Sequence, residues 1–251
     1  MTKLEKSSPH GETLIPKRAM LLAAGLGKRM MPVTETLPKP MVRISGKPLI
    51  DYGLSALENI GVETAVVNVH YLAEQIEDHL AACESPEILI SDERDSLLDS
   101  GGGIAKALDH FGNEPFFVLN ADSFWIEGFR PNLLRLAEQW DGSKMDILLL
   151  VCGIAEAIGY TGMGDFTMDA DGLLKRRDER EMGPFVYAGA AILHPRIFDD
   201  LPCPVFSLNR QFDVALEQER MFGVRLDGLW LHVGTPDSIR EAEEAIAHSA
   251  A

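Results

Sequence analysis

The residues best suited to chemistry stand near the N-terminus, where an apolar run ends in a turn with two glycines and two cations. Gly25 and Gly27 bracket one leucine and are followed directly by Lys28 and Arg29. Glycine has no Cβ and adopts positive φ cheaply, so such a turn can bring backbone N–H groups close to a bound anion. The pattern therefore predicts a phosphate-binding loop.

The residues after this turn indicate which phosphate the loop could bind. A dinucleotide-binding fingerprint needs a third glycine for close packing of a helix on the strand, but Met30 occupies that position. The P-loop pattern is absent too. The guanidinium of Arg29 offers forked donors that suit a triphosphate. Lys39 adds another cation on a segment stiffened by Pro38 and Pro40.

A carboxylate follows the apolar run 115–120, and we predict that it binds a metal ion. Asp122 stands just after this run. A carboxylate at the end of a buried parallel strand is costly unless it binds a cation or caps a helix. Mg²⁺ prefers one or two carboxylates together with phosphate oxygens, so Asp122 is our candidate Mg²⁺ ligand, and a helix cap is the alternative.

The elements that must position these residues follow from hydrophobic periodicity. Apolar strands are expected over 18–24, 64–69, 87–91, 115–120 and 145–151, and helices over 48–60, 71–82, 99–108 and 132–140. This alternation predicts an α/β fold, a Rossmann-like three-layer sandwich with a mainly parallel mixed sheet. Ligands of such sheets bind beyond the carboxyl ends of the strands. From 159 to 191 short strands and turns follow, with a hairpin signal at Asp171-Gly172.

Composition limits the partners and the compartment. The 251 residues can bury one large core, whereas residues 1–16 are polar and aperiodic, which predicts a flexible extension. A net charge of −16 argues against nucleic acid and anionic membranes as partners, yet residues 17–47 hold seven Lys or Arg against one acid. The three cysteines have no metal-ligand spacing, and no run could span a membrane, so we expect a cytoplasmic chain.

The motif G-x-G-x-R-M-x-P-x-T, followed by P-K-P-M, resembles the sugar-1-phosphate nucleotidylyltransferase family from about Lys17 to Ala247. The chain looks closest to the short bacterial members that transfer uridylyl to N-acetylmuramate 1-phosphate. The resemblance implies a nucleotide-diphospho-sugar transferase fold over 17–251, with a small sugar-binding lobe around 159–230. It also implies Mg²⁺ as cofactor, a nucleoside triphosphate (UTP in the short bacterial members) and a sugar 1-phosphate as substrates, and pyrophosphate as a product.

The resemblance further implies roles for individual residues. Arg29 would brace the β and γ phosphates, Lys39 would neutralise the α-phosphate, and Asp122 would hold Mg²⁺. The nucleotide-binding residues would be Ala23, Ala24, Gly25, Gly27, Lys28, Gly102, Gly103 and Asn120. The sugar-binding residues would be Asp165, Gly189 and Asn209. The residues alone leave a second interpretation of Gly102 and Gly103, which is a flexible turn without a role in base binding. The basic run 175–180 is interleaved with acids, and we interpret it as a solvated hairpin.

One position departs from the family pattern. Many members have a second metal-binding aspartate where His232 stands, and neutral imidazole is a poorer partner for Mg²⁺. We favour a metal held by Asp122, water and phosphates, and we keep His232 as a candidate ligand. A softer ion and a packing role for His232 are the alternatives. Guanylyl transfer to mannose 1-phosphate or a heptose phosphate, and a non-catalytic nucleotide-sugar sensor, stay open, as does the oligomeric state.

Overall fold

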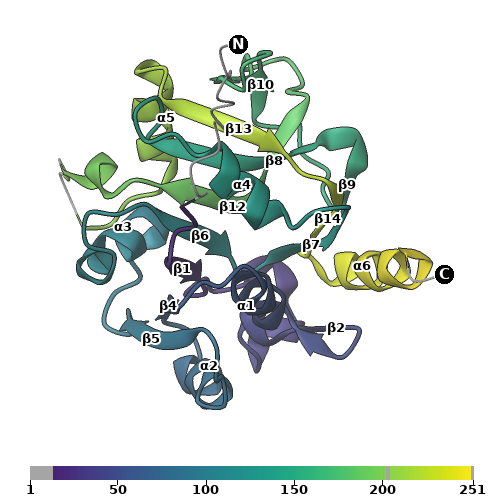
Figure 1. Cartoon of the computed structure of the whole chain (residues 1–251). Coiled ribbons are helices and arrows are strands. Elements are labelled where there is room, and N and C mark those ends of the chain that lie inside the picture. The colour runs from purple at the N-terminus through teal and green to yellow at the C-terminus, as the bar shows by residue number, and fades with distance from the viewer. Residues whose placement is uncertain (1–13, 200, 202–203, 250–251) are drawn as a thin grey trace, which may run out of the picture.

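A computed structural model of the chain describes residues 14–199, 201 and 204–249. Within these residues a nine-stranded central sheet has helices on both faces (Figure 1). The predicted α/β three-layer architecture is therefore confirmed. The expected extension over 1–16 lies outside the described residues except for its last three, Leu14 to Pro16.

The first half of the chain builds the parallel part of the sheet, in the order β6-β1-β4-β5. Its strands are β1 (Arg18–Leu22), β4 (Thr64–Val69), β5 (Glu87–Asp92) and β6 (Phe116–Asn120). The crossovers contain α1 (Leu49–Asn59), α2 (Ala73–Leu80) and α3 (Asp99–Lys106). All seven elements were predicted, with ends within two residues of those observed.

The second half of the chain makes the sheet mixed. Its strands are β8 (Ile147–Gly153), β10 (Phe166–Met168), β11 (Leu174–Arg176), β12 (Phe185–Leu193) and β13 (Met221–Arg225). Strand β12 runs antiparallel to both β6 and β8, and β10 and β11 form the hairpin predicted at 171–172. Helices α4 (Asn132–Gln139) and α5 (Asn209–Glu217) cover this half. Because β12 and β13 belong to the central sheet, a separate sugar-binding lobe stays a prediction.

Successive residues of the central strands face two different apolar clusters. In β1, Ala19 and Leu21 pack with residues of α1, α2 and α4, whereas Met20 packs with residues of α3 and α5. All three side chains are fully buried. A sheet covered on both faces explains why these strands read as continuous apolar runs.

A smaller sheet and the C-terminal helix form a third apolar cluster. Strands β7 (Ser123–Glu127), β9 (Ala157–Ile158) and β14 (Gly228–His232) make this sheet, and α6 (Pro236–Ser249) contacts it and the hairpin of β2 (Arg43–Ile44) and β3 (Lys47–Pro48) (Figure 1). Met30 is fully buried in this cluster, beside Leu231 of β14 and Ala242 of α6. Met30 stands where a dinucleotide-binding fingerprint has its third glycine, and its burial here anchors the predicted phosphate loop.

A buried carboxylate fastens the antiparallel half. Asp146 precedes β8, and its side chain is only 9% exposed. Its Oδ2 lies 2.8 Å from Arg220 Nε, and its Oδ1 lies 2.5 Å from Arg196 Nε. Burial disfavours the ionised form, but the two guanidinium groups outweigh this cost and hold the pKa of Asp146 below its ordinary value.

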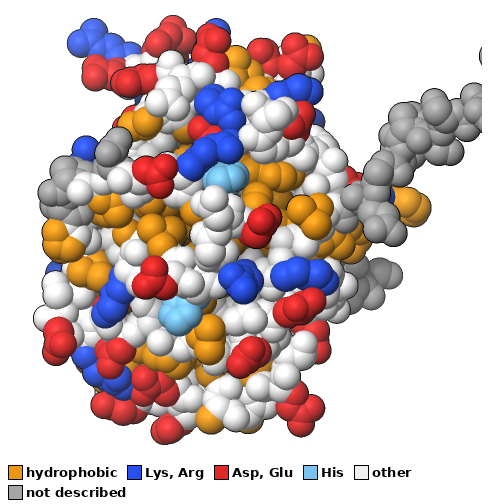
Figure 2. Space-filling view, turned by 60° about the vertical axis from the view of Figure 1, so that its left-hand side comes forward, with side chains coloured by type: hydrophobic (Ala, Val, Ile, Leu, Met, Phe, Trp, Pro, Cys, Tyr) orange, Lys and Arg blue, Asp and Glu red, His pale blue; other side chains and the backbone are white. Residues whose placement is uncertain are grey.

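The surface carries charged side chains of both signs. On the face shown in Figure 2, acidic and basic side chains are interspersed around a central band of hydrophobic side chains. Among the described residues, no helix combines the length and the apolar character needed to cross a bilayer.

Candidate active site

The predicted phosphate loop follows β1, and Gly27 contacts residues further along the same loop. Gly27 has a φ of 62° and precedes the 3-10 turn Lys28–Met30. A Cβ at Gly27 would lie 3.0 Å from Thr34 Cγ2 and 3.2 Å from Lys39 Cβ. The Thr34 hydroxyl donates to the Gly27 carbonyl oxygen at 2.9 Å. Positive φ and crowding together explain why glycine stands here.

An ion pair joins this loop to the end of β6. Lys28 and Arg29 are exposed, but Lys39 is only 9% exposed, and its Nζ lies 2.9 Å from Asp122 Oδ2. Burial disfavours the ionised carboxylate of Asp122. The positive charge of Lys39, with a smaller contribution from Arg29, nevertheless holds the pKa of this carboxyl below its ordinary value.

Arg29 and His232 meet beside Gly234. A Cβ at Gly234 would lie 2.7 Å from His232 Nε2 and 3.6 Å from Arg29 Nη1, so the glycine leaves room for both side chains. The His232 ring also packs against Trp230 and Tyr160, with centroids 5.6 and 6.3 Å apart. Burial lowers the pKa of His232 and favours the neutral imidazole. The structure therefore brings Arg29, Lys39, Asp122 and His232 together at one end of the sheet.

A pocket of about 520 Å³ opens beside this cluster. Its walls include Ala24, Gly25, Asn120 and Asp122, four of the residues predicted to bind nucleotide or metal. Ala23 lies just behind the wall, buried, with its N–H bonded to an asparagine side chain of β4. The residues that line this pocket include the last residue of β1 and Asp99, the first residue of α3.

The glycines of α3 serve helix packing in this structure. Gly101 and Gly102 donate their N–H groups to the Phe206 carbonyl oxygen at 3.0 and 3.1 Å. A Cβ at Gly102 would lie 2.2 Å from the Pro204 carbonyl oxygen, and Gly103 is buried as well. The missing side chains let α3 approach the segment that precedes α5. Contact of Gly102 and Gly103 with a base stays a prediction.

A second pocket of about 220 Å³ adjoins the first, since Leu22, Ser100 and Asn120 line both. Asp165 and Asn209, two of the predicted sugar-binding residues, line this second pocket. The carboxylate and amide can both bond hydroxyl groups. We call these two adjoining pockets the groove, with Asn120 at their junction.

Gly189, the third predicted sugar-binding residue, lies at an irregularity of β12 behind this junction. Its φ is 83°, and a Cβ there would lie 2.3 Å from Ser123 Oγ and 3.3 Å from Asn120 Cβ. A residue with a side chain would therefore push against the wall that carries Asn120. The structure supports a role of Gly189 in shaping the groove, and direct contact with a sugar stays a prediction.

Sequence reasoning missed two residues of the second pocket. Arg176 was interpreted as part of a solvated hairpin, but it lines the pocket, and its Nη2 donates to Asn209 Oδ1 at 3.0 Å and to Asp213 Oδ1 at 2.8 Å. Tyr187 lines it too, and its N–H donates to Asp165 Oδ2 at 2.9 Å. Both contacts join segments more than twenty residues apart, which local patterns do not reveal.

Asp122 suits the predicted magnesium ion. Within the described part of the chain, no group of three or more His, Cys, Asp or Glu side chains is arranged to hold a metal. Mg²⁺ needs only one or two carboxylates when phosphate oxygens and water complete its shell. The carboxylate of Asp122 alone is therefore enough for an ion that arrives with a triphosphate. Ligation by His232 stays a prediction.

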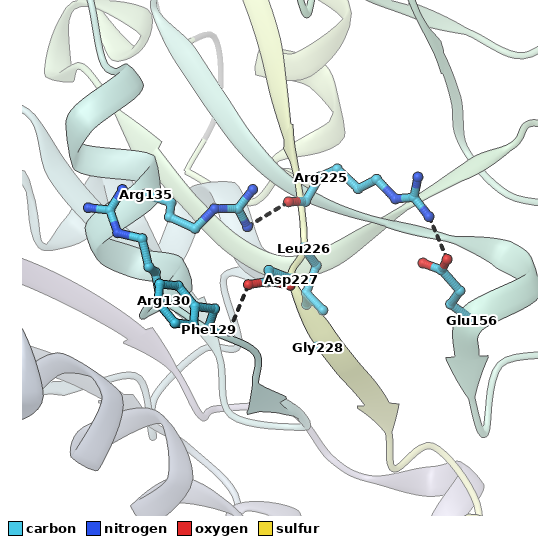
Figure 3. Close-up of a pocket in the computed structure, with 8 residues that line it drawn as sticks. All are labelled: Phe129, Arg130, Arg135, Glu156, Arg225, Leu226, Asp227 and Gly228. Carbon is cyan, nitrogen blue, oxygen red and sulfur yellow. Dashed lines mark hydrogen bonds and ion pairs between the residues drawn. The ribbon is translucent and has the colours of Figure 1, made fainter.

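A further pocket of about 410 Å³ lies between α4 and the connection from β13 to β14 (Figure 3). It contains three arginines, each bound to a protein acceptor. Arg135 donates to the Arg225 carbonyl oxygen at 2.8 Å, Arg225 pairs with Glu156, and Arg130 pairs with Glu138. Two of the three guanidinium groups are thus paired with carboxylates, and this pocket contains none of the residues predicted to bind phosphate.

The chain belongs to the Nucleotidyl transferase family, whose model matches residues 18–249. The N-acetylmuramate alpha-1-phosphate uridylyltransferase of Caulobacter vibrioides is 44% identical over 238 residues, covering 93% of this chain and 98% of that protein. The enzyme of the same name from Neisseria meningitidis serogroup B is 33% identical over 229 residues, with 90% and 96% covered. The predicted family resemblance is confirmed.

More distant relatives and solved structures share the fold. The mannose-1-phosphate guanylyltransferase catalytic subunit beta of Drosophila pseudoobscura pseudoobscura is 29% identical over 227 residues, and 59% of it is covered against 87% of this chain. A UDP-glucose pyrophosphorylase complexed with UDP-glucose has a TM-score of 0.75 at 21% identity, with 93% of this chain and 99% of that chain covered. HddC from Yersinia pseudotuberculosis, complexed with GMP-PN, has a TM-score of 0.73 at 24% identity, with 92% and 99% covered. These likenesses confirm the predicted fold.

Proposed function

We propose that this chain transfers a uridylyl group from UTP to N-acetylmuramate 1-phosphate and releases pyrophosphate. Support comes from the family and from a relative of nearly equal length that carries this activity in its name. The single structural observation behind the proposal is the meeting of Lys39, Arg29 and Asp122 beside a two-part groove. Such a groove suits two anionic substrates placed end to end.

The chemistry needs positioning more than proton transfer. A phosphate oxygen of the sugar 1-phosphate attacks the α-phosphorus of the triphosphate, in line with the departing pyrophosphate. This oxygen is already anionic, so neither a general base nor a covalent enzyme intermediate is required. Catalysis then rests on alignment and on neutralisation of charge.

Each charged side chain has a task that fits its surroundings. Arg29 is exposed on the loop and is placed to bind the β and γ phosphates. Lys39 is oriented by Asp122 and keeps further ammonium donors for the α-phosphate. Asp122 would hold Mg²⁺, which supplies charge neutralisation and alignment of the phosphates when bound. In this proposal Gly25, Gly27 and Lys28 contact the phosphate chain through the loop.

The remaining assignments follow from the groove. We place the nucleoside in the larger pocket and the sugar in the smaller one, beside Asp165 and Asn209. The strands and helix around 159–230 then act as the sugar-binding lobe, and His232 packs beside the metal. The reaction belongs in the cytoplasm, where nucleoside triphosphates are available. Guanylyl transfer to mannose 1-phosphate is the alternative, because relatives below 30% identity have this activity in their names.

One experiment separates these possibilities. Purified protein is incubated with Mg²⁺, each nucleoside triphosphate and a panel of sugar 1-phosphates, and pyrophosphate is measured. We expect UTP with N-acetylmuramate 1-phosphate to give the highest kcat/KM, and Asp122→Asn, a variant of equal size, to give almost none. Preference for GTP with mannose or heptose phosphate would support the alternative. Tight binding of a UDP-sugar without any turnover would indicate a sensor.

A further inference from the structure

A chain of buried hydrogen bonds joins the two walls of the nucleotide pocket, and we propose that its carboxylate, Glu93, is a positioning residue for the nucleoside triphosphate. The inference rests on the proposed function, because it assigns this pocket to the nucleotide. Glu93 follows β5 directly, and its side chain belongs to neither the cation cluster nor the predicted metal site.

Three hydrogen bonds make up this chain. The Ala23 N–H, just after β1, donates to Asn68 Oδ1 at 2.7 Å. Asn68 Nδ2 donates to Glu93 Oε1 at 2.7 Å, and the Leu98 N–H donates to Glu93 Oε2 at 3.0 Å. Asn68 is 3% exposed and Glu93 is 1% exposed. We call these four residues the relay.

The relay spans the nucleotide pocket from one wall to the other. Ala23 directly precedes Ala24 and Gly25, which line the pocket on the phosphate loop, and Leu98 directly precedes Asp99, which lines it at the start of α3. Asn68 and Glu93 themselves line the pocket between the two. Their hydrogen bonds therefore fix the distance between the walls that would enclose the nucleotide.

Gly103 leaves room for the relay. A Cβ at Gly103 would lie 2.6 Å from Glu93 Oε1 and 2.7 Å from Asn68 Nδ2. Neither atom can move away cheaply, because both are buried and each is bonded to the other. The relay thus gives a reason for glycine at this position that does not depend on contact with a base.

A carboxylate is the group that this position requires. Both protein groups that face Glu93, the Asn68 amide and the Leu98 N–H, are donors. A carboxylate accepts on both oxygens, whereas the amide of glutamine of the same shape turns a donor toward one of the two. Burying a carboxylate is costly, so an amide or apolar residue would be favoured unless both acceptor positions were needed.

The first test is Glu93→Gln. One of the two partners then faces an N–H₂ group, one hydrogen bond to a charged acceptor is lost, and the walls separate. We therefore expect the KM for UTP and the Kd of UTP from calorimetry to rise about tenfold or more. The KM for the sugar 1-phosphate should change less than about twofold. Glu87→Gln, at the exposed first position of β5, is the matched control and should change neither value.

The second test exchanges the two side-chain types. In the double variant Asn68→Asp with Glu93→Gln, the new carboxylate at position 68 accepts from Ala23 and from the new amide. The oxygen of that amide accepts from Leu98, so every donor again has an acceptor. We expect the double variant to return UTP affinity to within about threefold of the wild type. Asn68→Asp alone, which sets two carboxylates face to face, should weaken UTP binding.

The outcomes are distinct. Unchanged UTP affinity in Glu93→Gln, equal loss for both substrates, or no recovery in the double variant overturns the positioning role. If Glu93→Gln does not fold, the comparison of Asn68→Asp with the double variant decides the question by the same criterion. The proposed function is overturned instead if the wild-type protein binds UTP but no sugar 1-phosphate of the panel leads to release of pyrophosphate. In that case UTP binding still tests the relay.

Discussion

The ion pair of Lys39 and Asp122 allows a quantitative test of the site. Lys39→Met keeps a long side chain and removes the charge, so the half-buried carboxylate loses its main partner. Asp122→Asn removes the other charge at equal size. We expect each single variant to lower the free energy of unfolding by about 2 kcal/mol, because each leaves one uncompensated charge.

The coupling between the two charges can be estimated from their geometry. Two unit charges about 4 Å apart attract by about 1 kcal/mol in water and about 4 kcal/mol at an effective dielectric constant near 20. The Nζ and Oδ2 atoms are 2.9 Å apart, but 33% of the Asp122 side chain is exposed and is screened by solvent. We therefore expect the double variant to lose about 2 kcal/mol less than the sum of the single losses.

Urea unfolding of the four proteins measures this coupling, and pyrophosphate release measures the effect on catalysis. We expect turnover to fall at least about a hundredfold in each single variant and hardly further in the double variant, since the residues act as a unit. Additive losses of stability, with coupling below about 0.5 kcal/mol, would falsify the electrostatic account. Turnover above about a tenth of the wild type in Lys39→Met would contradict the catalytic role.

Three other expectations follow from the geometry. Arg29→Ala should lower turnover about a hundredfold with unfolding unchanged, because Arg29 is exposed, whereas Lys17→Ala, in the same basic segment, should leave turnover intact. Gly189→Ala should lower the free energy of unfolding by about 2 kcal/mol, and adding Ser123→Ala should recover the part due to the 2.3 Å contact but not the part due to positive φ. Asp146→Asn should cost about 2–3 kcal/mol at pH 7. Since the folded pKa of Asp146 is lowered, its contribution is present above the ordinary carboxyl pKa and is lost as the pH falls through the folded value, so urea unfolding at a series of pH values should show less acid sensitivity in the variant.

The elements of the parallel half could be predicted because each depends on its own residues. The strand Thr64–Val69 was predicted to the residue, since a β-branched run with turn residues on either side is a local signal. The loop that follows β1 also has a local signal, because its glycines and cations are adjacent in the chain, and its binding of phosphate stays a prediction. Composition and periodicity gave no comparable signal for the antiparallel pairing of β12 with β6 and β8, which depends on contacts across the sheet.

The direct contacts that complete the site join distant segments, so local patterns do not show them, even where both residues were predicted to belong to the site. Lys39 and Asp122 are 83 residues apart, and Asn68 and Glu93 are 25 residues apart. One unused signal was present: Asn68 interrupts an otherwise apolar strand. A polar side chain inside a buried strand needs a hydrogen-bond partner, so Asn68 could have been flagged as part of a network, although its partner could not have been named.

The burial of Met30 against β14 and α6 has a consequence for how the protein is made. A chain is synthesised from its N-terminus, so the predicted phosphate loop emerges from the ribosome long before the segment 228–249 against which Met30 packs. A nascent chain that ends before this segment has the reactive residues but not their anchor. Competence for turnover should therefore appear abruptly once residues 228–249 have emerged and folded, rather than growing as the chain lengthens.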